Sequence, residues 1–423
     1  MSCSSAEILE EERLGMIVFT STGDGVSSAE KRLKRHDICI ITTIHEPYDV
    51  RIYQRELQTL VEAGFSVCLV SAWERPPDRL PCAGWISLPM PRSRWGRLRH
   101  GARTFLAAFR VESRSYLFHD LDFVPWAVLL RWLKRVPVVY DCHENYHEEI
   151  LHGKEWIPRP FRCSLAAAVR IAEGWAVRRF DAVLAVTPHQ IRRFHRAGAR
   201  CVMVRNFASW GARPDVPHEP GLLHSGSLSE NYGVNILLGI ARELKRRAQP
   251  LPLVVADRFG ADQRLRRLFL EIVEREGLPV RLEPEVLPMH IDQLLSKGCI
   301  GLSVAQNSPS KQHGYPTKIF EYMAMGMPVV ASDLELTREV VETAGCGVLV
   351  PPDDPKAYVD AALAILHDPS RFQLYRQNGL KASEHVFHWK FEGARLVGLF
   401  RYLLRQSDDA PWTEVTDATT AQG

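Results

Sequence analysis

Residues 313–333 read HGYPTKIFEYMAMGMPVVASD, a stretch in which a helical pattern gives way to a strand pattern. Thr317 is expected to cap a helix at its start, and Gly326 to end it, because glycine tolerates the left-handed backbone that follows a last turn. Pro328 then opens the apolar run PVVA, which is typical of a buried strand. A helix followed directly by such a strand is the repeating unit of a parallel α/β sheet.

The same alternation extends along the chain in both directions. Apolar runs predict strands at residues 38–41, 66–71, 115–118, 136–140, 182–186, 201–204, 222–223, 253–256, 280–282, 300–304, 328–331 and 347–350. Because 423 residues exceed what a single core comfortably accommodates, they are expected to form two domains. We therefore predict an α/β protein with two tandem, Rossmann-like, doubly wound domains whose strand ends face each other across a cleft.

Composition shifts predict where these domains begin and end. Between them lies a stretch rich in Pro, Gly and His, which lacks periodicity. We expect a mobile arm that allows a short strand at residues 15–19, a first Rossmann-like domain, a linker, a second Rossmann-like domain and a disordered tail. Their predicted bounds are 1–35, 36–206, 207–221, 222–404 and 405–423.

The overall composition is that of an ordinary globular protein, with 46% apolar and 24% charged residues. This excludes wholesale disorder, collagen-like repeats and coiled coil. No apolar run approaches the roughly 18 residues that a membrane span requires, and the N-terminal residues are acidic where a signal peptide is basic. We therefore expect a cytoplasmic protein. The 9 cysteines are scattered without a CxxC pair, so no metal or redox centre is predicted.

Residues 36–206 carry 25 basic and 17 acidic side chains, a net charge of +8. Within them, residues 91–110 contain no acid, and four apolar side chains recur at helical spacing between arginines: Trp95, Leu98, Phe105 and Phe109. Two interpretations stay open. The helix lies on an anionic membrane surface, or its apolar stripe packs on the sheet while the arginines face water. Nucleic acid is not expected, because no recognised binding module accompanies the charge.

Lys318 is the unusual residue of the decisive stretch. A cation in the first turn opposes the helix dipole unless an anion lies there too. Glu321 lies three residues further, on the same face, where its carboxylate can accept hydrogen bonds from hydroxyls. The pair suits a nucleoside diphosphate with its ribose. The alternative is that Lys318 extends into solvent and Glu321 merely complements the dipole.

The motif Pro316-x-Lys318-x-Phe320-Glu321-Tyr-Met-Ala-x-Gly326-x-Pro328 resembles the donor-site signature of GT-B glycosyltransferases, specifically the retaining family 4. The resemblance covers about residues 36–400. It includes Asp49-Val-Arg51, Ala63-Gly64-Phe65, His119-Asp120-Leu-Asp122, Tyr140-Asp-Cys-His143-Glu144, FDAVLAVT at 180–187 and Val204-Arg-Asn206. It implies transfer of a sugar from a nucleoside diphosphate to an acceptor hydroxyl, with retention of configuration and without a metal cofactor.

The resemblance also implies roles for individual residues. Lys318 would hold the diphosphate and stabilise its charge as it leaves, and Glu321 would contact the ribose. His119 would approach the sugar near the reacting carbon; the alternative is an imidazole that satisfies the backbone at a strand end. The other donor-side candidates are Gly226, Ser227, Arg258 and His313. Those on the acceptor side are Asp49, Arg51, His143 and Glu144, the last two with a structural role as the alternative.

Three departures from the family pattern favour a degenerate binding subunit, one of two further hypotheses. His313 stands where family members commonly carry a glutamate, and Gly226-Ser227 and Tyr232-Gly233 stand where Gly-Arg and Lys-Gly are frequent. Two phosphate-binding cations are therefore missing. A degenerate, non-catalytic binding subunit and a sugar-nucleotide epimerase or phosphorylase on the same architecture stay open. For an active transferase, we expect a lipid-linked or surface-polysaccharide acceptor.

Overall fold

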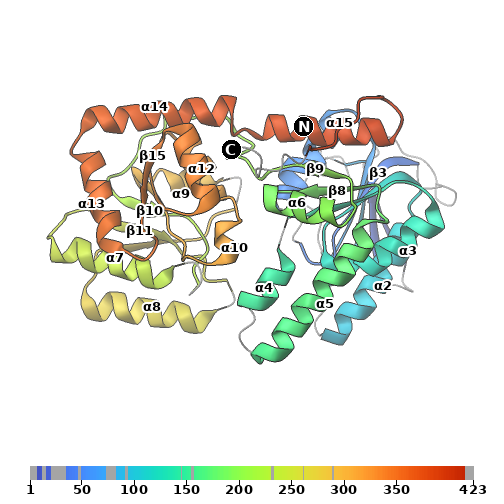
Figure 1. Ribbon diagram of the computed structural model, residues 1–423, viewed down its shortest axis with the longest axis horizontal. Coiled ribbons are helices and arrows are strands. Elements are labelled where there is room, and N and C mark those ends of the chain that lie inside the picture. Colours follow the sequence, from blue (N-terminus) through green and yellow to red (C-terminus); the bar gives the residue numbers. More distant parts are fainter. Residues whose placement is uncertain are drawn as a thin grey trace, which may run out of the picture. The chain divides into compact units, whose positions relative to one another are not determined.

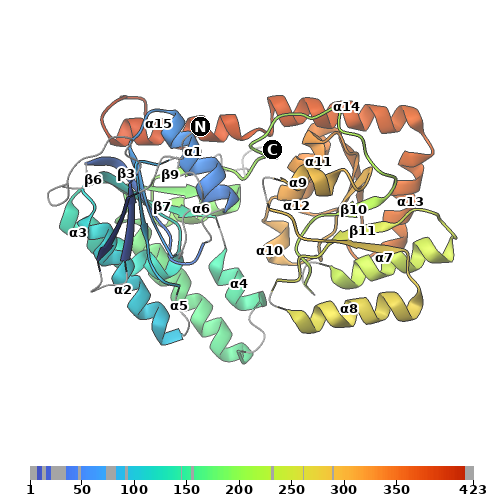
Figure 2. The same cartoon turned by 180° about the vertical axis from the view of Figure 1, so that it is seen from behind.

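The computed structural model describes residues 7–11, 16–20, 35–45, 49–72, 82–90, 94–143, 145–153, 157–229, 233–260, 262–287 and 290–414. The chain forms two compact units (Figures 1 and 2). Unit 1 comprises the described residues of Met1–Arg205 and Lys390–Gly423, and unit 2 comprises those of Asn206–Trp389. Each unit has its own sheet, as the sequence predicts.

Unit 1 contains a nine-stranded sheet in the order β1-β2-β5-β4-β3-β6-β7-β8-β9. All pairings from β5 to β9 are parallel. These strands are β3 (His36–Ile41), β4 (Val67–Ser71), β5 (Gly84–Ser87), β6 (Ser113–Phe118), β7 (Val138–Cys142), β8 (Ala182–Ala185) and β9 (Cys201–Met203). Their helices are η1 (Val50–Leu57), α1 (Gln58–Glu62), α2 (Arg94–Arg110), η2 (Leu121–Phe123), α3 (Val124–Lys134), α4 (Tyr146–Gly153), α5 (Arg159–Val177), α6 (Pro188–Arg196) and α15 (Trp389–Leu403).

Two segments of the predicted mobile arm belong to this sheet. β1 (Glu7–Glu11) and β2 (Met16–Thr20) form an antiparallel pair, and β2 also pairs antiparallel with β5. The strand expected at residues 15–19 is thus present, shifted by one residue, whereas β1 and β5 were not predicted. β5 pairs with β2 and β4, of which β2 is distant in the chain, and local periodicity does not reveal such a partner. The rest of the arm, except Arg35, lies outside the described residues.

Unit 2 contains a six-stranded, fully parallel sheet in the order β12-β11-β10-β13-β14-β15. The strands are β10 (Leu222–His224), β11 (Leu253–Ala256), β12 (Val280–Glu283), β13 (Ile300–Ser303), β14 (Val329–Ser332) and β15 (Gly347–Val350). The helices are α7 (Val234–Arg246), α8 (Gln263–Glu276), α9 (Ile291–Leu295), α10 (Pro309–Gln312), α11 (Thr317–Ala324), α12 (Glu335–Ala344), α13 (Pro355–Leu366) and α14 (Pro369–His385).

Both faces of the unit 2 sheet are buried, which explains its apolar strands. Alternate residues of one strand enter different hydrophobic clusters: Val330 packs with α7 and α13, whereas Val329 and Ala331 pack with α11 and α12. Side chains of a strand alternate between the faces of a sheet, so helices cover both sides. This is the doubly wound arrangement that the sequence predicts. Every predicted strand has a counterpart whose ends differ by at most two residues.

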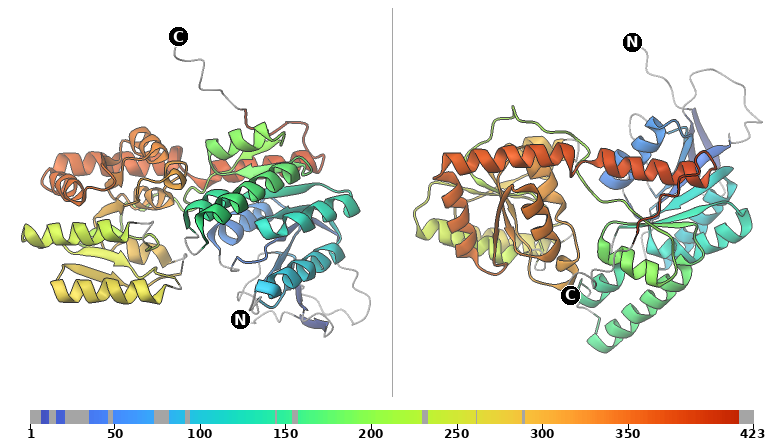
Figure 3. Two further views of the ribbon diagram at one scale, coloured as in Figure 1. Left: turned by 60° about the horizontal axis from the view of Figure 1, so that its bottom comes forward. Right: turned by 45° about the horizontal axis from the view of Figure 1, so that its top comes forward.

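The C-terminal part of the chain departs from the predicted boundaries. All of α15 but its first residue belongs to unit 1, where it lies beside the sheet (Figure 3). Residues 405–414, predicted to be part of a disordered tail, continue along this unit. The amide of Thr413 donates to the Cys201 carbonyl over 2.9 Å, and the Met203 amide donates to the Thr413 hydroxyl over 2.8 Å. A polar sequence thus finds backbone partners at the edge strand β9, which composition does not reveal.

α15 is held to unit 1 by a buried carboxylate. Glu392 accepts hydrogen bonds from the Arg205 amide, Nε and a terminal nitrogen over 2.9, 3.0 and 2.7 Å. Phe400 of the same helix packs edge-on against Phe65, with ring centroids 6.4 Å apart. In the described part of the chain, no helix combines the length and apolarity that crossing a bilayer requires.

We predict that Glu392→Ala lowers the free energy of unfolding by about 2 kcal/mol, because it removes a buried acceptor of three hydrogen bonds from one arginine. Urea unfolding measures the change, with Glu384→Ala, an exposed residue of α14, as the matched control. Equal stability of the two variants would contradict the anchoring role of Glu392.

Candidate functional site

Three loops meet at the carboxyl edge of the unit 2 sheet. Ser225, Gly226 and Ser227 follow β10, Arg258 follows β11, and the segment that leads into α10 and α11 follows β13. Parallel strands bring their carboxyl ends to one edge, which is where open α/β sheets bind ligands. The amide of Leu228 donates to the Arg258 carbonyl over 2.9 Å, so the first two loops are tied together.

Helix α11 is fixed over this edge by Tyr322. Its buried hydroxyl accepts from the Ser225 amide over 3.0 Å and lies 3.2 Å from the Leu302 carbonyl, to which it donates. Gly301 lies so close beneath the Tyr322 ring that any larger side chain would collide with it. The first turn of α11 is therefore held against the loop that follows β10.

The ends of α11 agree with the prediction in part. The helix begins at Thr317 with Pro316 as its cap, and no side chain accepts from its first turn, so the predicted cap at Thr317 is wrong. Gly326 adopts φ +68° beyond the last turn, as predicted. Among the described contacts the first turn thus has no side-chain cap, which is compatible with an external acceptor.

Lys318 and Gly226 are in direct contact. A methyl group built on Gly226 would lie 2.5 Å from the Lys318 Nζ and 3.0 Å from the His224 Nε2. Only glycine leaves this space free. Two of the donor-side candidates from the sequence, Gly226 and Lys318, therefore lie side by side.

The surroundings of Lys318 disfavour its charged form. Burial, and after it the nearby cations Lys311 and Arg258, lower the pKa of Lys318 to about 7, while Glu321 opposes the shift. Burial also lowers the pKa of Lys311 to about 8. Three basic side chains thus act on one small region at a helix start. An anion bound there would restore the charge of both lysines.

Sequence reasoning missed His224, the last residue of β10. Its Nδ1 lies 3.1 Å from the Leu302 carbonyl, which can only accept, so Nδ1 carries the proton and Nε2 offers a lone pair beside Gly226. Burial, and after it the charge of Lys318, lowers the pKa of His224 well below its ordinary value. A histidine among apolar strand residues resembles a core residue. Its place directly before the Ser-Gly-Ser loop was the available signal.

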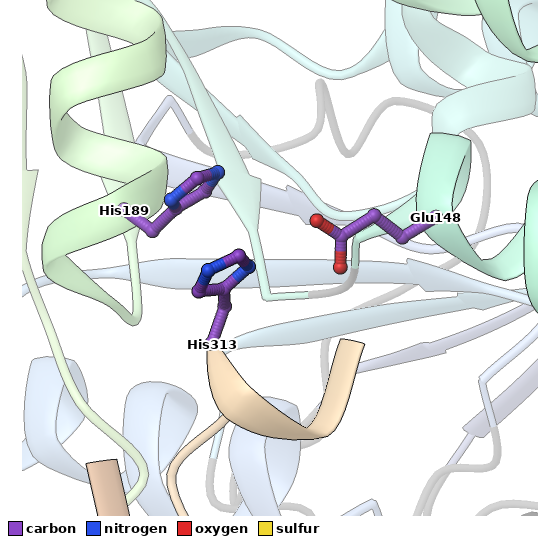
Figure 4. A group of neighbouring side chains, drawn as sticks. All are labelled: Glu148, His189 and His313. Carbon is purple, nitrogen blue, oxygen red and sulfur yellow. The ribbon is translucent and has the colours of Figure 1, made fainter. Parts of the chain in front are cut away.

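The other predicted donor-side residues lie in the same loops or on α11. The Arg258 Nε forms an ion pair with the Glu285 carboxylate over 3.1 Å. The Arg258 guanidinium also lies 3.5 Å from the Ser225 carbonyl. Ser227 is exposed, and Glu321 is one turn beyond Lys318. His313 follows α10, whose last turn it caps through its amide (Figure 4). Tyr232 lies outside the described residues.

In unit 1, the predicted residues His119 and Arg51 form a buried ionic network. The Arg51 guanidinium donates twice to the Asp141 carboxylate, each time over 2.6 Å, and lies 3.1 Å from the Glu56 carboxylate. The His119 Nε2 lies 2.7 Å from Glu56 and 3.6 Å from Asp141. Asp49 caps η1, which carries Arg51 and Glu56.

This network changes the interpretation of His119 and Arg51. His119 has no exposed surface, and Arg51 has almost none. Burial alone would lower the pKa of His119, but Glu56, Asp141 and Asp120 together raise it to about 9. Its Nδ1 also lies 3.3 Å from the Ile41 carbonyl, which is the strand-end role given as the alternative. His119 and Arg51 are therefore enclosed within unit 1, whereas the sequence analysis expected His119 to contact the sugar or acceptor and placed Arg51 on the acceptor side.

The atoms of Glu56, His119 and Asp141 lie within 4.8 Å of one another, close enough to hold a metal ion. However, the Arg51 guanidinium already binds both carboxylates, and the histidine is a cation beside them. Charge is thus balanced by side chains of the unit itself. These residues fit an ionic network better than a metal centre.

A second polar group of unit 1 includes His45, which sequence reasoning missed. His45 lies 3.5 Å from Asp49 and 3.3 Å from Asp120, and its ring lies 5.1 Å from that of His143. His143 also contacts Asp141 over 3.0 Å. Unlike His119, these histidines are partly exposed. His45 follows β3 and His143 follows β7. His143 therefore stays a candidate for the acceptor side, and His45 is a new one.

The remaining acceptor-side prediction, Glu144, lies outside the described residues. Unit 1 carries two further polar residues, Glu148 on α4 and His189 at the start of α6 (Figure 4). The prediction did not include them.

Two family models match the chain. Residues 50–229 match the glycosyl transferase 4-like domain, and residues 219–368 match glycosyl transferases group 1. The α-D-kanosaminyltransferase of Streptomyces kanamyceticus is 26% identical over 43% of this chain and 45% of its own length. The lipopolysaccharide core mannosyltransferase LpsB of Rhizobium meliloti is 34% identical over 23% of this chain and 28% of its own. The chain thus spans less than half the length of these curated relatives.

Solved structures resemble the whole fold. Sucrose-phosphate synthase from Thermosynechococcus elongatus has a TM-score of 0.66 at 17% identity, covering 88% of this chain and 100% of that one. HepE from Anabaena, in complex with UDP and glucose, has a TM-score of 0.66 at 16% identity, covering 86% and 99%. At these identities the likeness shows the fold alone, which is that of a GT-B protein.

We predict that Gly226→Ala abolishes anion binding without unfolding unit 2. The new methyl group would occupy the space beside the Lys318 ammonium, whose flexible chain can turn away with little loss of stability. We expect the dissociation constant for a nucleoside diphosphate to rise more than tenfold in calorimetry, with an unchanged thermal midpoint. Gly211→Ala, at an open position, is the control. Wild-type affinity in Gly226→Ala would contradict the site.

A second prediction concerns the pH dependence of stability. Because the pKa of His119 is raised from about 6.5 in the unfolded chain to about 9, its contribution is complete below pH 6.5 and is lost as pH rises through 9. His119→Gln should therefore cost about 3 kcal/mol at pH 6 and much less at pH 9.5. Urea unfolding at both values tests this, with the exposed His367→Gln as control. A cost that does not change with pH would show that His119 is neutral.

Proposed function

We propose that the chain, whose parts match two glycosyl transferase domain models and whose fold is that of a GT-B protein, transfers a sugar from a nucleoside diphosphate to an acceptor hydroxyl, with retention of configuration. The observation that carries the proposal is the half-buried amine of Lys318 beside Gly226, whose charged form burial and two neighbouring cations disfavour. A lysine in this state at a helix start suits a diphosphate, which would bring the charge that the site lacks.

In this mechanism the catalytic contribution of unit 2 is electrostatic. The bond between the sugar and the diphosphate breaks, the sugar becomes positively charged, and the diphosphate leaves with an added negative charge. Lys318, Arg258 and the first turn of α11 would stabilise that charge as it develops. We assign this role to side chains and backbone and propose no metal cofactor. We also propose no covalent nucleophile.

The nucleotide base and the sugar of the donor are proposed from the position of Glu321 and from a structurally similar protein. Glu321 lies one turn beyond Lys318, where it would accept hydrogen bonds from the ribose hydroxyls. The structurally similar HepE is described with UDP and glucose, so UDP-sugars are the first donors to test. For the acceptor, we propose a lipid-linked or polysaccharide precursor. Relatives include LpsB and the phosphatidyl-myo-inositol mannosyltransferase of Mycobacterium leprae, 33% identical over 19% of this chain.

One group of observations favours a second candidate, a binding subunit without turnover. Ser227 replaces a cation that family members often carry, His313 replaces a glutamate, and Glu285 takes part of the charge of Arg258. In unit 1, His119 is enclosed by its own ionic partners. Such a protein would bind a sugar nucleotide and release it unchanged.

Thermal shift with UDP-, GDP-, ADP- and TDP-sugars, followed by NMR of the product with the stabilising donor, separates these candidates. A ligand at 100 times its dissociation constant should stabilise the protein by about 2.7 kcal/mol. We predict transfer with retained anomeric configuration. Binding without turnover, across lipid-linked and saccharide acceptors, would favour the binding subunit, and inversion would contradict the stereochemical proposal.

The contribution of Lys318 is tested by Lys318→Met, which keeps the length of the side chain and removes its charge. We expect donor affinity to fall about tenfold or more, because a charged hydrogen bond is worth about 1.5–3 kcal/mol. Lys356→Met, at an exposed position of α13, should bind like wild type. Unchanged affinity in Lys318→Met would refute the assignment of the diphosphate to this helix start.

A further inference from the structure

Helix α5 of unit 1 exposes a row of large apolar side chains. Phe161 is 71% exposed, Leu165 43%, Ile171 69% and Trp175 53%. With 3.6 residues per turn, these four lie within about 120° of the helix circumference and extend along roughly 20 Å of its length. The buried residues of α5, which include Ala166 and Val177, lie on the opposite side.

The charges around this apolar row have one sign. Arg178 is exposed and lies about 20° beyond Ile171 on the helix circumference, and the guanidinium of Arg179 lies 3.3 Å from the centre of the Trp175 ring. The single acidic residue of α5, Glu173, is buried and bound to Arg193 over 2.6 Å. The exposed side of α5 is therefore apolar and basic, with no carboxylate.

The surface continues onto the neighbouring helices. α3 packs against both α5 and α2, and the three helices lie side by side in Figures 1 and 2. On α3, Trp132 is 71% exposed and Leu133 is also exposed. On α2, Arg99 and Arg103 are exposed. Apolar and basic side chains thus extend over three adjacent helices, although Glu112 after α2 adds one exposed acid.

The exposed apolar row lies on α5, whereas the sequence analysis considered the helix at residues 91–110 for a membrane contact. Phe105 is buried and packs on Trp126, with ring centroids 5.5 Å apart, so at this residue the sheet-cover interpretation is correct. Phe109 is half-exposed under the Lys134 ammonium. The side chains of Trp95 and Leu98, and of Arg92, Arg94 and Arg97, lie outside the described residues.

We propose that α5 lies flat on the surface of an anionic lipid bilayer, with its apolar row inserted among the headgroups and its arginines paired with lipid phosphates. An apolar row flanked by arginines matches such an interface. A second copy of the chain on the same face is disfavoured, because it would bring two basic surfaces together. The proposal uses no feature of the donor site and stands independently of the proposed function.

Flotation of the full chain with vesicles tests this proposal. Vesicles of phosphatidylcholine with 0, 20 and 40% phosphatidylglycerol are compared at low and high salt. We expect wild type to float only with anionic vesicles, and less so at high salt. Phe161→Ser/Ile171→Ser should reduce the bound fraction at least fivefold. Both residues are largely exposed, so folding should be kept. Arg99→Ser/Arg178→Ser should reduce it without removing any apolar side chain.

Leu268→Ser/Leu374→Ser is the matched control, because it removes two half-exposed leucines from unit 2. It should float like wild type. Absence of wild type from all vesicles, or equal flotation of Phe161→Ser/Ile171→Ser and wild type, would overturn the proposal. So would a dimer on size exclusion that this double variant dissolves, since a second copy would then cover α5.

Discussion

The donor-side geometry of unit 2 depends on one constraint, a lysine ammonium held against a glycine at the start of a helix. The Tyr322 hydroxyl fixes α11 to the strand ends, and the bare backbone of Gly226 leaves room for Lys318. Burial and two neighbouring cations act against its charge. The fold thus maintains a cation where the protein itself offers little compensation, which is the expected state of an anion site before its ligand binds.

The buried charges of unit 1 show the opposite arrangement. There, Arg51 and His119 face Asp141 and Glu56 directly, so each charge has a partner of opposite sign within the same unit. Removal of one partner would leave a buried charge uncompensated, so these residues contribute to the stability of unit 1. Both sets lie at or near the carboxyl ends of parallel strands. Local charge balance therefore distinguishes the ligand site from the structural network where position alone does not.

Local sequence patterns predicted the parallel strands and the glycine that ends α11, because both depend on residues adjacent in the chain. The juxtaposition of Gly226, Arg258 and Lys318 was also predictable, since parallel topology brings strand ends to one edge. The pairing of β2 with β5, the return of α15 and the pairing of Thr413 with β9 depend on distant partners and were not. For His119 and Arg51, residue type and spacing gave no information on whether the side chain points inward. His224 was missed because a lone histidine in an apolar run resembles core.

Direct titration of the Lys318 amine tests the central claim. NMR of the ¹³Cε resonance, assigned with Lys318→Met, reports its pKa in the free protein and with a bound nucleoside diphosphate. The account predicts a pKa of about 7 in the free protein and an upward shift of at least one unit with the ligand, as the anion restores the ammonium. An ordinary value near 10.5 that does not respond to the nucleotide would contradict it.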